Sequence, residues 1–179
     1  MGVTGRAIWE CDAFGTFFEQ GGRAFYRPAI NNGAGGRWAG GGDANGGGAY
    51  GTPEYTPFTS AHMINFEWLE HGAGANRIFP ASADLLDAAG RTVITAYAVH
   101  RPDGDWSFML INHDLNAAHR IHLAIDDASH APHSFAGPIG LVQFCNTPSD
   151  DKNTTIAPSP DGMYTLPIGS ITVIRGKLR

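Results

Sequence analysis

The chain has 179 residues, enough for one domain with a sizeable core, and 16% of its residues are charged. Its formal net charge is −5 and its positive charges are scattered, so we expect no nucleic-acid partner. No apolar run is long enough to cross a membrane, and residues 1–20 lack a signal-peptide pattern, so we expect no membrane partner either.

The first part of the chain combines two helical patterns with a short strand pattern. Residues 5–20 predict a helix because apolar side chains recur on one face, and Gly21 and Gly22 would end it. Residues 23–27 predict a short strand. Residues 57–71 predict a second helix, because a threonine and a proline stand where an N-cap and a first helical residue belong.

Residues 31–51 form a glycine-rich segment in which ten of the 21 positions are glycine. Trp38 and Tyr50 are its large apolar residues, too few to offset the entropy of ordering the chain. We predict a long loop, and long loops inside compact domains are often functional.

The second half of the chain has the period of two that is typical of strands. Predicted strands cover residues 91–99, 105–112, 119–125, 138–146 and 169–178. A polar, proline-containing loop is expected over residues 147–161. The fold class that follows is mainly β, an antiparallel, Greek-key-like β-sandwich.

One hairpin, "ITAYAVHRPDGDWSFMLINHD" at residues 94–114, carries many polar side chains. Those of Arg101, Asp103 and Asp105 bracket the "RPDG" turn, and turn chemistry explains most of them. Residues 106–111, "WSFMLI", are apolar at both alternating sets of positions apart from the serine. This pattern predicts a strand covered on both faces, one by the opposite sheet and the other by a barrel or another element.

Three of these motifs together resemble one group of enzymes. They are the hairpin, "LPIGSITVIRGKL" near the C-terminus and the helix "AIWECDAFGTFFEQGG". The set is similar to the C-terminal region of clan A glycoside hydrolases, closest to the β-xylosidase and α-L-iduronidase family and its β-glucuronidase relatives. The resemblance covers nearly all of the chain apart from the glycine-rich segment. It implies the end of a (β/α)8 barrel followed by a β-sandwich, in a secreted or periplasmic parent.

The resemblance also implies how the chain is divided. Residues 1–72 would be a partial barrel segment and residues 73–179 the C-terminal β-sandwich domain. Within the first part, the helix 5–20 would be the seventh barrel helix and the helix 57–71 the eighth. The loop between them would lie on the active-site face, where the loops after the barrel strands meet. The barrel would be incomplete, so the sandwich folds alone, another chain completes the barrel, or the gene model begins at an internal methionine.

We assign no catalytic residue in this chain. The clan uses two glutamates about 5 Å apart, after the fourth and at the end of the seventh strand, and both positions would precede Met1. No residue here matches either motif. The carboxylates of the two predicted helices are interpreted as surface acids: Glu10, Asp12, Glu19, Glu67 and Glu70.

Candidate sugar-binding residues lie in and beside the glycine-rich segment. The rings of Trp38, Tyr50 and Tyr55 could stack on a sugar, and Glu54 could contact sugar hydroxyls. For the three rings, the plain alternative is a disordered or self-packed loop.

We expect neither a metal site nor a cofactor. His130 and His133 flank a dipeptide and could in principle share a metal, but no HExxH or CxxC pattern occurs. Cys11 and Cys145 are interpreted as buried thiols, although one pair of cysteines leaves a disulfide open.

Two main functions remain open at this point, beside a weaker third one, an independent metal enzyme that uses the histidines. In the first, the chain is a C-terminal glycoside hydrolase fragment whose sandwich stabilises the catalytic barrel; it would be inactive alone and would meet carbohydrate through the parent's barrel. In the second, it is a stand-alone carbohydrate-binding or interaction module. Loss of polysaccharide binding on Trp38→Ala or Tyr50→Ala would favour the second.

Overall fold

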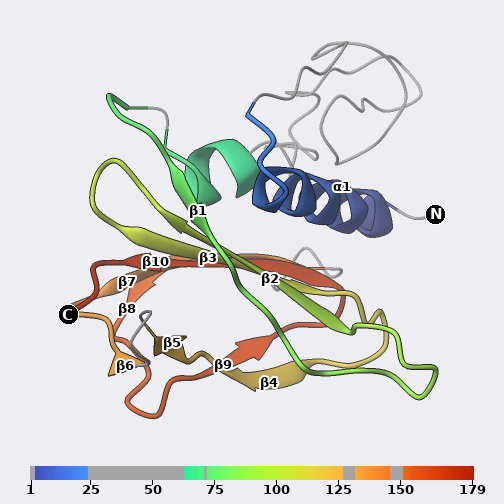
Figure 1. Ribbon diagram of the computed structural model, residues 1–179. Coiled ribbons are helices and arrows are strands. Elements are labelled where there is room, and N and C mark those ends of the chain that lie inside the picture. Colours follow the sequence, from blue (N-terminus) through green and yellow to red (C-terminus); the bar gives the residue numbers. More distant parts are fainter. Residues whose placement is uncertain (1–2, 24–62, 71, 127–131, 146–150) are drawn as a thin grey trace, which may run out of the picture.

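The computed structural model describes residues 3–23, 63–70, 72–126, 132–145 and 151–179. These residues form three layers, with a six-stranded antiparallel sheet in the middle (Figure 1). Helix α1 (Val3–Glu19) and the π-helix η2 (Met63–Trp68) lie on one face, and four short strands lie on the other. The predicted class, a mainly β antiparallel sandwich, is confirmed. No helix in the described ranges is long and apolar enough to cross a membrane.

The large sheet has the strand order β1-β2-β3-β10-β7-β8, with every neighbouring pair antiparallel. Its strands are β1 (Arg77–Phe79), β2 (Ile94–His100), β3 (Trp106–Asn112), β7 (Ile139–Phe144), β8 (Lys152–Ile156) and β10 (Ser170–Gly176). Four of these match predicted strands to within a few residues. Strand β8 corrects the predicted loop 147–161: it is an exposed edge strand, so its polar "KNTT" stretch needs no apolar alternation.

The small strands of the third layer form two pairs. Strand β4 (His119–His122) pairs with β9 (Met163–Leu166), and β5 (Ile125–Asp126) pairs with β6 (Pro132–His133). The predicted strand 119–125 is therefore split between β4 and β5.

Helix α1 confirms the prediction for residues 5–20, including its end. The amide of Gly22 donates to the carbonyl of Phe17 at 2.9 Å and that of Gly21 to Phe18 at 3.0 Å, the Schellman pattern. Gly21 has a φ of 85°, which glycine adopts without steric penalty.

Other predictions for the first 72 residues are tested only in part. The strand 23–27 beyond its first residue and the glycine-rich segment 31–51 lie outside the described residues. The predicted helix 57–71 is described from Met63, where it takes the wider π-helical form over six residues. The division at residues 72 and 73 stays a prediction.

Both faces of the large sheet are buried, each in its own core. Tyr97, Met109 and Ile111 join side chains of α1 and η2 in the first core. Phe108 and Leu110 join the third layer in the second. The prediction that β3 is covered on both faces is thereby confirmed, and the element that covers its second face is the pair of helices.

Because α1, η2 and the sheet share the first core, they should unfold together. Trp68 is fully buried there, between Phe18 and Tyr97, with 6.1 Å between ring centroids on each side. In a variant that keeps Trp68 alone (Trp9→Phe, Trp38→Phe, Trp106→Phe), urea transitions followed by fluorescence and by far-ultraviolet circular dichroism should coincide. A fluorescence transition at lower urea than the circular-dichroism transition would contradict a shared core.

Candidate functional site

The four predicted sugar-binding residues, Trp38, Tyr50, Glu54 and Tyr55, lie outside the described residues, so their role stays a prediction. His130 is also outside them, whereas His133 lies on β6. Within the described ranges, no group of three or more histidines, cysteines, aspartates and glutamates could hold a metal ion. Cys11 and Cys145 are both buried as thiols and form no disulfide with each other.

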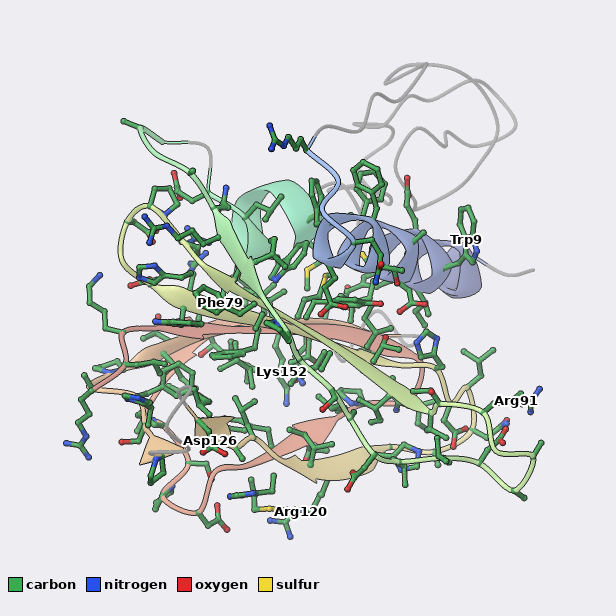
Figure 2. All side chains as sticks on the ribbon, viewed as in Figure 1. Trp9, Phe79, Arg91, Arg120, Asp126 and Lys152 are labelled. Carbon is green, nitrogen blue, oxygen red and sulfur yellow. The ribbon has the colours of Figure 1, made fainter. Side chains whose placement is uncertain are left out.

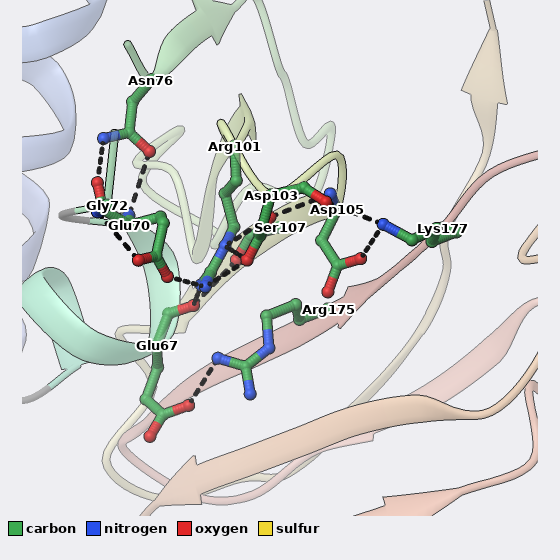
Figure 3. Close-up of polar contacts among 10 residues, drawn as sticks. All are labelled: Glu67, Glu70, Gly72, Asn76, Arg101, Asp103, Asp105, Ser107, Arg175 and Lys177. Atoms are coloured by element: carbon green, nitrogen blue, oxygen red, sulfur yellow. Dashed lines mark hydrogen bonds and ion pairs between the residues drawn. The ribbon is translucent and has the colours of Figure 1, made fainter. Parts of the chain in front are cut away.

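The most elaborate polar cluster in the described chain is built around the guanidinium of Arg101, which is only 4% exposed (Figure 3). Its Nη2 contacts Glu70 Oε2 at 2.7 Å and Asp103 Oδ2 at 2.9 Å. Its Nη1 donates to the backbone carbonyl of Glu67 at 2.8 Å. Arg101 thus joins the β2–β3 turn to the end of η2.

The end of η2 needs such donors, because the last carbonyls of a helix have no partner within it. Ser107 Oγ donates to the same carbonyl of Glu67 at 3.1 Å, and the serine is fully buried. The side chain of Glu67 reaches β10, where its Oε2 lies 3.2 Å from Arg175 Nη1 (Figure 3). The cluster therefore ties one helix end to the β2–β3 turn and to two strands of the sheet, β3 and β10.

Lys177 extends the cluster toward solvent. Its Nζ donates to the backbone carbonyl of Asp103 at 2.9 Å and lies 3.1 Å from Asp105 Oδ1. Beside it is an open hollow of about 490 Å³, lined by Asp105, Gly140, Thr155, Arg175 and Lys177 among others. The two cationic side chains of the hollow, Arg175 and Lys177, are engaged by Glu67 and Asp105. We therefore interpret these charges as ion pairs that hold the fold together.

A second polar cluster joins α1 to the sheet through the carboxyl group of Asp12. Oδ1 of Asp12 accepts hydrogen bonds from Tyr97 Oη at 2.6 Å and Thr95 Oγ1 at 2.7 Å. His113 Nε2 lies 3.0 Å from Thr95 Oγ1 and 3.7 Å from Asp12 Oδ1. Thr16 Oγ1 lies 3.1 Å from Tyr97 Oη.

The electrostatics of this cluster favour an ionised carboxylate beside a neutral phenol. Burial alone would raise the pKa of Asp12, but the neighbouring His113 and the hydrogen bonds from Tyr97 and Thr95 outweigh it, so the pKa lies below its ordinary value. Burial, together with the hydrogen bond to Asp12, raises the pKa of the Tyr97 phenol. Two hydroxyl donors converge on one oxygen of Asp12, with His113 beside them, so the carboxylate serves the protein's own side chains.

Both clusters correct the interpretation of the helical carboxylates as surface acids. Glu10 and Glu67 are buried, with 4% and 8% exposure, and Asp12 is half-buried. Helical spacing places a side chain on a face of its own helix but says nothing of what packs on that face. The turn held a signal that could have indicated this cluster: with Arg101 and Asp103, it carries more charged side chains than a simple β-turn requires.

Comparisons with known proteins give structural neighbours only. No family model matches the chain, and no curated protein matches it. Among solved structures, the chain is similar to CelM2, a bifunctional glucanase-xylanase from a metagenome library. They share 20% identity with a TM-score of 0.37, over 49% of this chain and 16% of that one.

Two further similar structures are also glycoside hydrolases. The family 44 endoglucanase Cel44A from Clostridium thermocellum shares 20% identity with a TM-score of 0.37, over 48% of this chain and 17% of that one. The family 51 α-L-arabinofuranosidase from Thermotoga petrophila RKU-1 shares 17% identity with a TM-score of 0.36, over 49% and 20%. The chain spans a fifth or less of each, and TM-scores this low do not establish a shared fold.

Removing the Arg101 guanidinium should strongly destabilise the fold. Arg101→Ala leaves the buried Glu67 carbonyl and two carboxylates without their cation, which should lower the free energy of unfolding by about 3–5 kcal/mol. Urea denaturation measures the change. Arg91→Ala is the matched control, because Arg91 is 81% exposed in its ion pair with Asp87 and should change stability by less than about 1 kcal/mol. Equal effects of the two variants would contradict the role of Arg101.

The lowered pKa of Asp12 predicts an acid-dependent contribution to stability. A carboxyl group whose folded pKa is depressed stabilises the fold fully above its unfolded pKa, about 3.9, and loses that effect as pH falls through the folded pKa. Asp12→Asn should therefore lower the free energy of unfolding by about 1–3 kcal/mol at pH 7. The difference from the wild type should shrink at pH 3.

Urea titrations at both pH values test this, with Asp84→Asn as the control for removal of an exposed carboxylate. A stability difference for Asp12→Asn that stays constant between pH 7 and pH 3 would count against the ionised carboxylate as the stabilising species.

Proposed function

We propose that this chain is the C-terminal part of a glycoside hydrolase, in which the β-sandwich packs on the catalytic barrel and stabilises it. The observation that carries the proposal is the shared core of α1, η2 and the large sheet. The motifs that resemble clan A glycoside hydrolases suggest what the packed parts are. The helices α1 and η2 would belong to the barrel, and the large sheet would belong to the sandwich.

The packing supports a stabilising role on physical grounds. Ala7, Ile8 and Cys11 of α1 are at most 5% exposed, and all lie against the sheet. Burying apolar surface contributes about 25 cal/mol per Å², so a barrel that includes these helices would gain stability from the sheet. The polar contacts of Arg101 and Asp12 would fix the orientation of sheet and helices.

The same proposal makes the chain inactive alone. No residue in this sequence matches the motif of either catalytic glutamate of the clan. Glu67 and Asp12, the carboxylates best placed by the structure, are engaged by Arg175 and by Tyr97 and Thr95. Glycoside hydrolysis requires two carboxyl groups that act on the same sugar. Here both Glu67 and Asp12 are bound by the protein's own side chains instead.

Assays of the purified chain against aryl β-xylosides, β-glucuronides and α-L-arabinofuranosides test the proposal. We expect rates no higher than those of a mock preparation from cells without the gene. Robust turnover that survives further purification steps would overturn it.

A binding measurement separates the proposal from a stand-alone module. Saturable polysaccharide binding that is lost on Trp38→Ala or Tyr50→Ala, with no turnover, would favour an independent carbohydrate-binding module that uses the glycine-rich segment. Unchanged binding behaviour in both variants agrees with the proposal made here.

A further inference from the structure

We infer that the outer strands of the large sheet carry a binding site for an acidic sugar chain, formed by Phe79, His100 and Trp106 with Arg77 at its edge. We call these four residues the aromatic platform. The platform is distinct from the glycine-rich segment and from the two polar clusters, and it does not depend on the parentage of the chain.

Strand register places the four side chains on one face of the sheet. Arg77 on β1 is opposite His100 on β2, and His100 is opposite Trp106 on β3. In the neighbouring row, Phe79 is opposite Ala98. Directly paired residues of antiparallel strands point to the same face, so a cation, an imidazole and an indole form a row across three strands.

The small side chain of Ala98 allows the rings to meet across β2. The ring centroids of Phe79 and Trp106 are 4.7 Å apart, and those of His100 and Trp106 are 5.1 Å apart. Phe108 supports the indole from the core side, nearly parallel to it at 6.3 Å. Phe79 is 39% exposed and Trp106 is partly exposed, so the rings form a supported surface that a ligand can reach.

The charge at the edge of the platform indicates the kind of ligand. Arg77 is exposed, and no hydrogen bond or ion pair within the described ranges engages its side chain. By contrast, the buried Arg101 and the partly buried Arg175 are both paired with glutamates. A guanidinium without a protein carboxylate is complementary to a carboxylate on the ligand, which it can bind in a bidentate manner.

The size of the exposed surface argues for a small ligand rather than a protein. Phe79 is the only exposed large apolar side chain on the platform; the others in the described ranges, including Trp9, lie elsewhere. A stable protein interface buries about 800 Å² on each partner, far more than one ring supplies. A sugar ring needs one apolar face to stack and a polar neighbour to orient it, and a uronic acid adds the carboxylate that Arg77 would bind.

Figure 2 shows the two controls that the chain offers. Trp9 lies on the outer side of α1 and Arg91 at the far end of the sheet, both away from Phe79 (Figure 2). Trp9 is 61% exposed and Arg91 81% exposed. Trp9→Ala therefore removes an exposed ring, and Arg91→Gln an exposed cation, without touching the platform.

Affinity electrophoresis of the full chain tests the inference with polysaccharides in the gel. The acidic probes are polygalacturonate, alginate and a glucuronate-substituted xylan; the neutral ones are methyl-esterified polygalacturonate and a xylan without uronate. We expect at least one acidic probe to retard the chain more than its neutral counterpart. Arg77→Gln should weaken that binding by at least about tenfold, and Phe79→Ala by about two- to tenfold for acidic and neutral probes alike.

Circular dichroism and urea denaturation first establish that each variant is folded, and binding is compared only among folded variants. The inference is overturned if no acidic probe retards the chain, or if Arg77→Gln and Phe79→Ala bind as the wild type does. It is also overturned if Arg91→Gln weakens binding as much as Arg77→Gln, since that would show attraction to net charge alone. Turnover of aryl glycosides, the test of the proposed function, is a separate readout, so either proposal can fail while the other stands.

Discussion

The burial of the central strands on both faces is the constraint on which the rest of this structure depends. Strands β3 and β10 are buried at both alternating sets of positions, and Ile111, Val173 and Ile174 are at most 1% exposed. A sheet of this kind is stable only if two layers cover it. The helices α1 and η2 cover one face and the four short strands cover the other, which is why the β-sandwich here also has a helical layer.

Hydrophobic burial sets how much area is covered, but it is not directional, and the polar clusters set the orientation of the helices. Arg101 is the clearest case. Its guanidinium satisfies a helix-end carbonyl, a glutamate and its own turn aspartate within one plane, which a lysine could not do. Asp12 has a comparable role at the other contact, where hydrogen bonds from Thr95 and Tyr97 define how α1 meets β2.

The two faces of the large sheet differ in how their polar groups are used. The chemistry-bearing groups of the helix-covered face are turned inward and paired, so that face holds the molecule together. On the other face, at β1, the exposed Arg77 has no ion pair within the described ranges and stands beside Phe79, which is also exposed. In the two proposals above, the helix-covered face supports a barrel and the other face binds a sugar chain.

Local features of the chain could be predicted from sequence because their causes are local. The end of α1 at Gly21, the "RPDG" hairpin and the two apolar faces of β3 each depend on residues within a few positions. Strand β8 escaped prediction because an exposed edge strand imposes little pattern on its side chains. Glu67 of η2 was interpreted as a surface acid because its partner lies far along the chain: Arg175 is 108 residues away.

By itself, then, the sequence determined which segments are apolar on one face and which on two, since periodicity is a property of neighbouring residues. Only the tertiary structure decided what covers the second face of β3, and which charges meet. Asp12 and Thr95 are 83 residues apart, and Arg77, His100 and Trp106 form a row only through the register of three strands. Such meetings depend on strand order and layer packing, which no local pattern encodes.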